Sequence, residues 1–460
     1  MEDASTIVIY SSPEHLNTMF LLAKFITKNQ LTVRVTVLCS APAPAEVQDL
    51  ASVTYHRIPE AVPSVPIDDL VEQFFEIPRL SNADVRNALQ EISRKFKIDA
   101  LVIDFFCYSA FEVSTSLNIP TYFYISAGGF AACFLFYFLV IDENVHGNIA
   151  DLDEFLECPG GPPVHTSELP KLIAFRRNKT YQHFLRTAME AKKSKGILVN
   201  SFDALEFRAK EALSNGLCVP NGVSPPVYFV GPLIGETAGK SNGGVHECVK
   251  WLDSQPNRSV IFLCFGRRGL FSAKQVKEIA VGLENSGHRF LWSVRRPPEM
   301  QSSSPAGEFE LDEILPDGFL ERTKKRGLVI QSWAPQKEVL SHNSVGAFVT
   351  HCGRSSILEA VSFGVPMIGW PIYAEQHMNR VLLVEEFKLG LPLSAAPAPA
   401  DGFVTAEVLE SRIREMMESE TGRAIRHRTS EMKVSAAAAV RGNGTSVAAL
   451  EQFVRSLREG

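Results

Sequence analysis

The sequence predicts an α/β protein made of two domains, each with a parallel sheet between helices. Two observations predict this fold class. The chain has 460 residues, which is too long for one hydrophobic core, and domains of roughly 200 to 250 residues are expected. Short apolar runs also alternate with helix-like stretches in both halves of the chain, and this alternation is typical of parallel sheets with helices on both faces.

The predicted strands are the short apolar runs. In the first half they are residues 7–10, 32–38, 53–56, 100–104, 121–125 and 196–199. In the second half they are residues 260–265, 290–294, 328–331, 345–350 and 366–370. We therefore expect two doubly wound, Rossmann-like domains that face each other across one cleft, because such sheets bind ligands beyond the carboxyl ends of their strands.

The domain boundary is expected in residues 231–244, a stretch rich in glycine with proline, serine and threonine. We expect an N-terminal domain over residues 1–240 and a C-terminal domain over residues 241–440. Residues 441–460 are expected to form a last helix that packs back on the N-terminal domain. Residues 295–311 and 394–402 are expected to be surface loops.

Composition excludes several classes of protein. Hydrophobic content of 45% and charged content of 21% are ordinary for a soluble globular protein, and a net charge of −6 without a basic block argues against nucleic acid. The eight cysteines are scattered without metal-ligand spacing, which indicates reduced thiols. The first residues do not resemble a secretory signal, and the longest apolar run, 130–141, is too short to span a bilayer. We expect a cytoplasmic monomer without metal, cofactor or membrane insertion.

The most informative segment is residues 333–376, which begins WAPQ and ends AEQ. Within it, 345–350 is a predicted strand, 351–356 a turn and 357–363 a helix. Backbone N–H groups at a helix start have no intrahelical partner, and the helix dipole favours anions there, so a phosphate fits this turn. Ser355 and Ser356 add hydroxyl donors. The alternative is that Ser356 and Glu359 form only a capping box.

This segment resembles the signature box of the plant UDP-dependent glycosyltransferases that modify small molecules. The resemblance implies a GT-B fold, in which the N-terminal domain binds the acceptor and the C-terminal domain binds the UDP-sugar. In that family the opening tryptophan stacks on uracil, the box glutamine and glutamate hold the ribose, the histidine turn holds the diphosphate, and the closing acid-amide pair holds sugar hydroxyls. The implied donor-binding residues are Trp333, Ala334, Gln336, His351, Gly353, Ser355, Ser356, Glu359, Glu375 and Gln376.

Two residues depart from the family pattern HCGWNS, since this chain reads HCGRSS. Ser355 still offers a donor, but Arg354 places a planar cation where the tryptophan faces the sugar. A guanidinium pairs best with a carboxylate, and UDP-glucuronic acid is the donor that carries one. This arginine resembles that of plant flavonoid 7-O-glucuronosyltransferases. Ser126, which matches a family residue near the sixth carbon of the sugar, is expected to assist it. The alternative is that Arg354 is solvated or pairs with the diphosphate.

Arg267 and Arg268 are a further departure, in a loop where the family usually reads FGS. They remove one hydroxyl and add two cations, which either neutralise the diphosphate or are solvated. His351 as a metal ligand is another alternative, but no cluster of partner ligands supports it in the sequence.

The candidate catalytic residues follow two predicted strands of the first half. A serine and a proline after strand 7–10 are helix-start signals, which place His15 in a first helical turn where the dipole favours the neutral ring. A neutral histidine is a usable general base. Asp104 ends the apolar run 100–104. Taken alone, His15 is as compatible with a structural role, and Asp104 with a turn or cap.

The resemblance implies that His15 takes the proton of the acceptor hydroxyl and that Asp104 orients it. Glu14 stands where the family usually has glycine, which leaves the geometry of this turn open. Phe106, Tyr124 and Phe130 are candidate contacts for a flat phenolic acceptor, with ordinary core positions as the alternative.

The resemblance implies an inverting, metal-free transfer of glucuronic acid from UDP-glucuronate to a flavonoid hydroxyl, at the 7-position of a flavone. One alternative is a flavonoid O-glucosyltransferase that uses UDP-glucose. A nicotinamide oxidoreductase would share the fold, but no GxGxxG follows the first strand. A non-catalytic ligand-binding relative would need a broken pair of His15 and Asp104.

Overall fold

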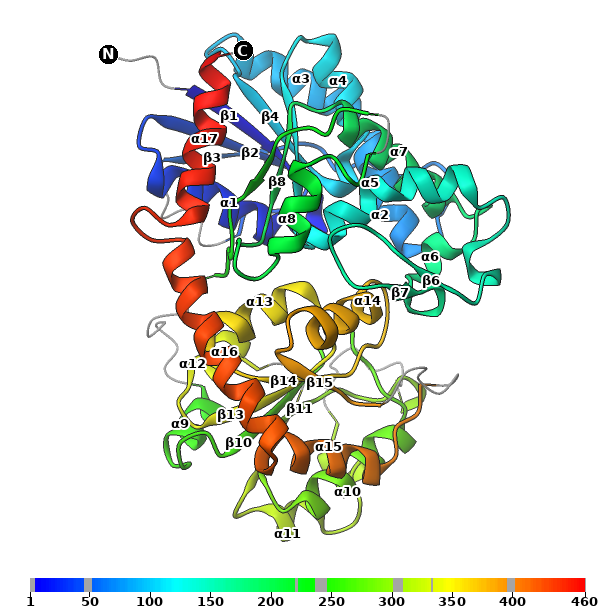
Figure 1. Ribbon diagram of the computed structural model, residues 1–460, viewed down its shortest axis with the longest axis vertical. Helices are drawn as coiled ribbons and strands as arrows, with labels where there is room; N and C mark the ends of the chain where they lie inside the picture. Colours follow the sequence, from blue (N-terminus) through cyan, green and yellow to red (C-terminus); the bar gives the residue numbers. More distant parts are fainter. Residues whose placement is uncertain are drawn as a thin grey trace. The chain divides into compact units, whose positions relative to one another are not determined.

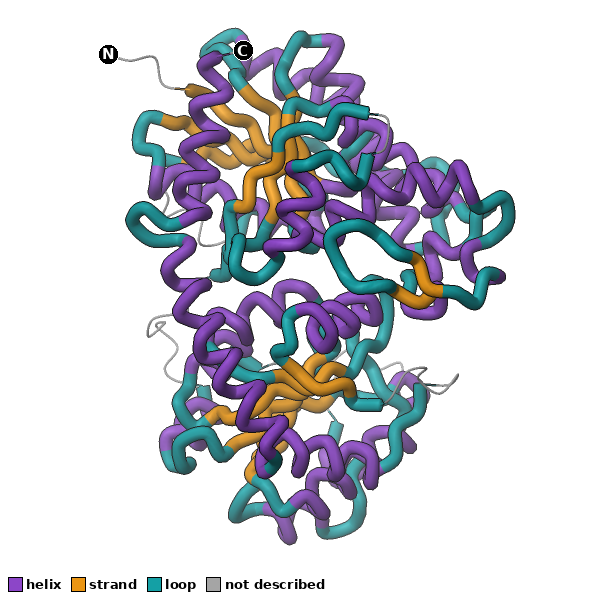
Figure 2. Tube along the Cα trace, in the orientation of Figure 1, coloured by secondary structure: helices purple, strands orange, loops and turns teal. Residues whose placement is uncertain are grey.

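The computed structural model describes residues 5–44, 52–219, 222–235, 246–300, 309–331, 334–394 and 402–459. The chain divides into two compact units, Met1–Ile234 with Ala436–Gly460, and Gly235–Ser435. Each unit contains a parallel sheet, orange in Figure 2, with helices around it. The predicted fold class, α/β with two doubly wound domains, is confirmed.

The first unit is built on a parallel sheet with the strand order β3-β2-β1-β4-β5-β8-β9. The chain extends the sheet in one direction from β1 and in the other from β4, so its topological switch point lies between these two strands. The strands are β1 (Ser5–Tyr10), β2 (Val33–Cys39), β3 (Val53–Arg57), β4 (Ala100–Asp104), β5 (Thr121–Ile125), β8 (Gly196–Val199) and β9 (Val227–Phe229), with a separate antiparallel pair of β6 (Phe155–Leu156) and β7 (Val164–His165).

The helices of the first unit connect these strands and cover the sheet. They are α1 (Leu16–Asn29), α2 (Leu70–Leu80), α3 (Asn82–Ser93), α4 (Ala110–Ser116), α5 (Gly129–Asn144), α6 (Lys171–Ala174), α7 (Lys179–Lys193), α8 (Phe207–Ser214) and α17 (Thr445–Glu459). Short 3-10 turns are η1 (Pro13–His15), η3 (Phe105–Cys107), η4 (Ile149–Asp151) and η5 (Thr166–Glu168). The apolar run 130–141 lies within α5. No helix in the described ranges is long and apolar enough to cross a bilayer.

The C-terminal helix α17, red in Figure 1, belongs to the first unit. Its apolar side shares one core with α1 and the sheet, and this side includes Leu450, Phe453 and Leu457. The ring of Phe453 lies edge-on to Tyr122 of β5, with 4.9 Å between centroids. Because each fully buried apolar side chain contributes roughly 1.5–3 kcal/mol, these contacts fix the end of the chain on the first sheet.

The second unit has a parallel sheet of order β12-β11-β10-β13-β14-β15, with its switch point between β10 and β13. Its strands are β10 (Val260–Cys264), β11 (Arg289–Val294), β12 (Gly327–Gln331), β13 (Val345–Thr350), β14 (Met367–Gly369) and β15 (Gly390–Pro392). Its helices are α9 (Glu247–Asp253), α10 (Ala273–Ser286), α11 (Phe319–Thr323), α12 (Gln336–Ser341), α13 (Arg354–Phe363), α14 (Gln376–Val381), α15 (Ala406–Glu418) and most of α16 (Glu420–Ala439), with turns η6 (Pro298–Met300), η7 (Leu311–Glu313) and the π-helical η8 (Leu382–Glu386).

Some sequence-based boundaries differ from the structure or fall outside it. The helix expected at 357–363 begins three residues earlier, as α13, because Gly353 takes the N-cap position. Strands β9 and β15, of three residues each, were not predicted. Most of the expected linker and the middle of both expected loops (236–245, 301–308 and 395–401) lie outside the described residues.

Candidate active site

His15 and Asp104 meet at the switch point of the first sheet. Strands β1 and β4 are neighbours and run parallel, so the segment after β1 and the end of β4 lie at the same edge of the sheet. Ser12 and Pro13 begin the turn η1, which ends at His15, and α1 continues from Leu16. Glu14 lies inside this turn without a positive φ, so the turn does not require the glycine that the family usually has there.

Asp104 is a buried carboxylate that holds both His15 and Ser12. Its side chain is 1% exposed, whereas that of His15 is 28% exposed. The Nδ1 atom of His15 lies 2.6 Å from Oδ1 of Asp104. Oδ2 accepts the backbone N–H of Ser12 at 3.4 Å and the hydroxyl of Ser12. With Nδ1–H donated to the carboxylate, the neutral ring carries its lone pair on Nε2, which is the arrangement of a general base.

Ser12 is a residue of this site that the sequence did not reveal. Its serine and proline neighbours predicted a helix cap, and Ser12 does occupy the N-cap position of η1, but its side chain makes no cap hydrogen bond. Its hydroxyl donates to Asp104 instead, because a carboxylate is a stronger acceptor than a neutral group. The spacing of the serine from a distant aspartate gives no sequence signal.

An aromatic cluster lies beside His15. The ring of Phe106 is 4.8 Å from the imidazole and 5.3 Å from the ring of Phe74, centroid to centroid. Phe75 lies edge-on to Phe106 and stacks on His183. Among the predicted acceptor contacts, Phe106 is half-buried and adjoins His15.

The two other predicted acceptor contacts have almost no exposed surface, because Tyr124 is 0% and Phe130 is 1% exposed. Tyr124 belongs to the core under α1. This placement matches the alternative that they are core residues. Ser126 is half-buried in the turn that follows β5.

The switch point of the second sheet is formed by two turns that close on His351. Gly266 follows β10, and Gly353 follows β13 and caps α13. A Cβ atom would lie 2.7 Å from Nε2 of His351 at Gly266 and 2.5 Å from it at Gly353. A side chain at either position would therefore displace His351, and Gly266 also has a left-handed φ of +70°. Burial lowers the pKa of His351 to about 4, so its ring is neutral at pH 7 and can donate one N–H to an anion.

The start of α13 is the predicted phosphate cradle. Cys352 has a φ of +63°, and this left-handed residue turns the chain from β13 into the helix. Asn379 secures the turn by donating to the carbonyl of Cys352 at 3.0 Å. Ser355 is exposed and Ser356 is buried. The first N–H groups of a helix of ten residues are the donors that an anion meets here.

Ser356 and Glu359 do not form a capping box, since the N-cap residue is Gly353 and α13 has no side-chain cap. That alternative is wrong. Instead, Nε2 of Gln336 donates to Oγ of Ser356 at 3.0 Å and to Oε2 of Glu359 at 2.7 Å. Burial raises the pKa of Glu359, and the hydrogen bond from Gln336 lowers it and so offsets part of this effect. The amide and the carboxylate are thus held together, as a ribose diol would require.

Arg354 is the first residue of α13 and is only 5% exposed. Its guanidinium carbon lies 5.9 Å from the centroid of the Phe387 ring. The alternative that this side chain is solvated is therefore wrong. A buried guanidinium at a helix start adds a full positive charge to the partial charge of the helix dipole.

The end of the segment 333–376 forms a second turn, which leads into α14. Oε1 of Gln376 accepts the backbone N–H groups of Ile372 and Tyr373 at 2.9 and 3.0 Å, which leaves its amide nitrogen as the end that can donate to a ligand. Glu375 is half-buried at the N-cap position of α14. Burial raises the pKa of Tyr373, an effect that nearby Arg268 and Arg267 oppose.

The remaining predicted donor residues fall into different environments. Ala334 is buried, Arg267 is exposed and Arg268 is half-buried. Trp333 lies outside the described residues. Among the residues that the structure describes, no group of three or more His, Cys, Asp or Glu side chains is placed to hold a metal ion.

Comparison with known proteins identifies the family. The pattern of the family described as "UDP-glucoronosyl and UDP-glucosyl transferase" matches residues 216–390. A "Baicalein 7-O-glucuronosyltransferase" from Scutellaria baicalensis is 52% identical over 446 residues, which is 96% of this chain and 100% of the relative. The chain belongs to this family. An "Anthocyanidin 5,3-O-glucosyltransferase" from a Rosa hybrid cultivar is 42% identical and covers 98% of each chain.

A solved UDP-glycosyltransferase has the same fold throughout. The structure of Phytolacca americana UGT2 complexed with UDP-2fluoro-glucose and pterostilbene has a TM-score of 0.86 and 33% identity, over 99% of this chain and all of that one. The GT-B fold implied by the resemblance is therefore confirmed, and the chain is a UDP-glycosyltransferase. The roles of the individual site residues stay predictions, which the geometry above makes specific.

Proposed function

We propose that this UDP-glycosyltransferase transfers glucuronic acid from UDP-glucuronate to a phenolic hydroxyl of a flavonoid, at the 7-position of a flavone. The observation that carries the proposal is Arg354, a buried guanidinium at the start of α13. A guanidinium binds a carboxylate in two-pronged, charge-assisted geometry. The carboxylate of glucuronate is such a partner, and glucose has none. That the Scutellaria relative is named a baicalein 7-O-glucuronosyltransferase supports this donor and acceptor.

In the proposed reaction Nε2 of His15 removes the proton of the acceptor hydroxyl, and Asp104 stabilises the imidazolium that forms. The oxygen attacks the anomeric carbon from the face opposite UDP and inverts it. The helix start of α13 and neutral His351 stabilise the departing diphosphate as preorganised donors. Phe106 contacts the flat acceptor beside His15. That the enzyme works without a metal, as a cytoplasmic monomer, stays a prediction.

The alternative is a glucosyltransferase, which the name of the Rosa relative supports. The two functions are separated by measuring kcat/KM for a flavone with UDP-glucuronate, UDP-glucose and UDP-galactose. A charge-assisted hydrogen bond contributes roughly 1.5–3 kcal/mol, so Arg354 should favour UDP-glucuronate by about 10- to 150-fold.

Replacing Arg354 with tryptophan should remove this preference, whereas Ser355→Asn should leave the donor ratio unchanged. Ser355 is the matched control because it is the other departure in the same box and its side chain is exposed. Equal rates of the wild type with all three donors would contradict the proposal. An unchanged donor ratio in Arg354→Trp would show that the preference arises elsewhere.

A further inference from the structure

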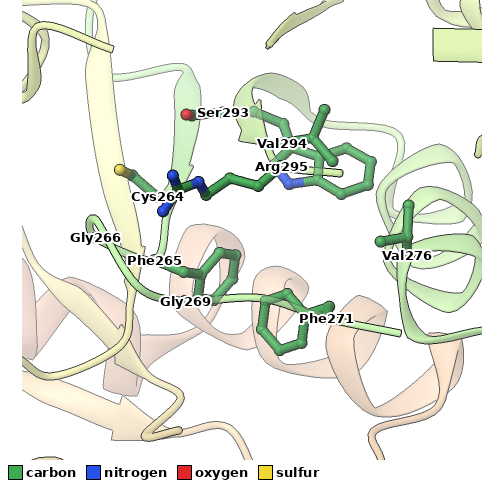
Figure 3. A pocket seen from close by; sticks show the side chains of 10 residues that line it. Cys264, Phe265, Gly266, Gly269, Phe271, Val276, Ser293, Val294 and Arg295 are labelled. Carbon is green, nitrogen blue, oxygen red and sulfur yellow. The ribbon is translucent and has the colours of Figure 1, made fainter. Parts of the chain in front are cut away.

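A small cavity lies at the carboxyl ends of β10 and β11 in the second unit (Figure 3). We call it the β10–β11 cavity, and its lining includes Cys264, Gly266, Trp292, Ser293 and Arg295. Its volume is about 10 Å³, which is room for roughly one water molecule. The side chain of Arg295 runs across it and points its guanidinium toward Cys264 (Figure 3). The guanidinium of Arg295 thus lines the cavity beside Cys264.

Arg295 has no counterion in the described part of the chain. Burial raises the pKa of the Cys264 thiol, and nearby Glu359 raises it further while Arg295 lowers it. Both charged groups thus act on the same thiol. However, the described residues provide neither a carboxylate within ion-pair distance of Arg295 nor a hydrogen bond to its guanidinium. A half-buried guanidinium that no described residue engages can bind an anion in two-pronged geometry.

The position of Arg295 adjoins the predicted phosphate cradle. In the sheet, β10 lies between β11 and β13. The start of α13 follows β13 on one side of the Gly266 turn, and Arg295 follows β11 on the other side. Gly266 has no side chain to separate the two, and a Cβ there would clash with His351. An anion held over the Gly266 turn would meet helix N–H groups from one side and a guanidinium from the other.

We propose that Arg295 is a further donor-binding residue, whose guanidinium binds the diphosphate of the UDP-sugar from the side opposite α13. This inference rests on the proposed use of a UDP-sugar. Binding draws the guanidinium out of the β10–β11 cavity toward the phosphates. Arginine is suited to this task because its planar donors match two phosphate oxygens at once. The proposed contact is with the phosphates and not with the base. Losing it should therefore leave the affinity for ligands without phosphate unchanged.

The test is calorimetric titration of the whole chain with UDP, UMP and uridine, for the wild type and Arg295→Gln. We expect Arg295→Gln to weaken UDP binding by about 10- to 100-fold, from the loss of a charge-assisted contact. Uridine affinity should stay within about twofold. Arg295→Lys keeps the charge but not the planar fork, and should show an intermediate loss for UDP.

The matched control is Arg289→Gln. Arg289 is the first residue of β11, so it lies at the amino-terminal end of the strand that Arg295 follows. It is also half-buried. Its replacement removes the same charge and should leave the affinity for all three ligands unchanged. Thermal unfolding of each variant shows whether it is folded. If Arg295→Gln does not fold, Arg295→Lys carries the test.

Three results would overturn the inference. An unchanged UDP affinity in Arg295→Gln, with normal binding by the wild type, would exclude the contact and leave the proposed function intact. An equal loss for UDP and uridine would assign Arg295 to the base or to the shape of the site. A wild type that does not bind UDP would instead refute the proposed function itself.

Discussion

Replacing Asp104 with asparagine tests whether the buried carboxylate acts through His15. In the folded protein the carboxylate receives Nδ1 of His15 at 2.6 Å and two donors of Ser12. Asparagine keeps the shape of the side chain but removes its charge. When His15 accepts the proton of the acceptor, the imidazolium then lacks the anion that stabilises it. The variant should therefore lose rate while it still binds UDP.

The size of the loss follows from the environment of Asp104. Its side chain is 1% exposed, so water does not replace the missing charge. A hydrogen bond to a charged partner contributes roughly 1.5–3 kcal/mol, against roughly 0.5–1.5 kcal/mol for a neutral one. If the difference of roughly 1–1.5 kcal/mol acts only in the transition state, kcat/KM falls by about 5- to 13-fold. The affinity for UDP should not change, because Asp104 bonds His15 and Ser12 and is not among the predicted donor-binding residues.

The assay is kcat/KM for a flavone with saturating UDP-glucuronate, with calorimetric binding of UDP as the folding check. Asp99→Asn is the matched control, because Asp99 directly precedes the same strand and its Oδ2 accepts the backbone N–H of Thr6 at 2.9 Å. This variant removes a carboxylate charge from the amino-terminal end of β4, where Asp99 accepts the N–H of Thr6 and pairs with Lys97. An Asp104→Asn enzyme with kcat/KM near that of the wild type, or an equal loss in Asp99→Asn, would refute the reasoning.

Two further predictions concern His351 and the turns around it. Its pKa is about 4 in the folded protein and roughly 6.5 in the unfolded chain, so the unfolded chain binds the proton first. The free energy of unfolding should fall by about 3 kcal/mol as the pH falls from 6.5 to 4, and His351 should not affect it above pH 6.5. In urea unfolding, this free energy should depend less on pH in His351→Gln than in the wild type. The same pH dependence in both proteins would contradict the prediction. Gly266→Ala should weaken UDP binding about tenfold or more, because its Cβ would lie 2.7 Å from His351. Gly287→Ala, with a similar φ of +73° and open space around it, should cost only backbone strain of roughly 1–2 kcal/mol, and equal effects on UDP binding would exclude the contact.

The strands were predictable where an apolar run is long enough to stand out. Residues 345–350 coincide with β13, and 100–104 with β4, because both strands are buried along their whole length. Strand β15 (Gly390–Pro392) contains glycine and proline, which are unfavourable in strands, and it is defined only by its pairing with β14. Such pairing is a property of the sheet and has no local sequence signal.

The site was predictable as separate pieces, but not as a network. His15 and Asp104 could each be placed at a strand end. Their hydrogen bond joins residues 89 positions apart and depends on β1 and β4 being neighbours in the sheet. The role of Ser12 could not be found, since its serine also fits a helix cap. Gln336 shows the same limit, because only the fold brings its amide to Ser356 and Glu359.

The two switch points place a histidine in opposite electrostatic settings, and this difference explains how one residue type can serve two purposes. His15 is partly exposed and bonded to a buried carboxylate, which stabilises the ring once it has taken a proton. His351 is enclosed between Gly266 and Gly353, and no carboxylate of the described chain contributes to its pKa, which burial alone lowers. The first setting suits a base whose protonated form must be stable during the reaction. The second suits a neutral donor beside phosphates, where the positive charges come from Arg354 and, by our inference, Arg295. His351 therefore stays uncharged near neutral pH. Arginines keep their charge over that range, so Arg354 and Arg295 are the residues that can neutralise a diphosphate there.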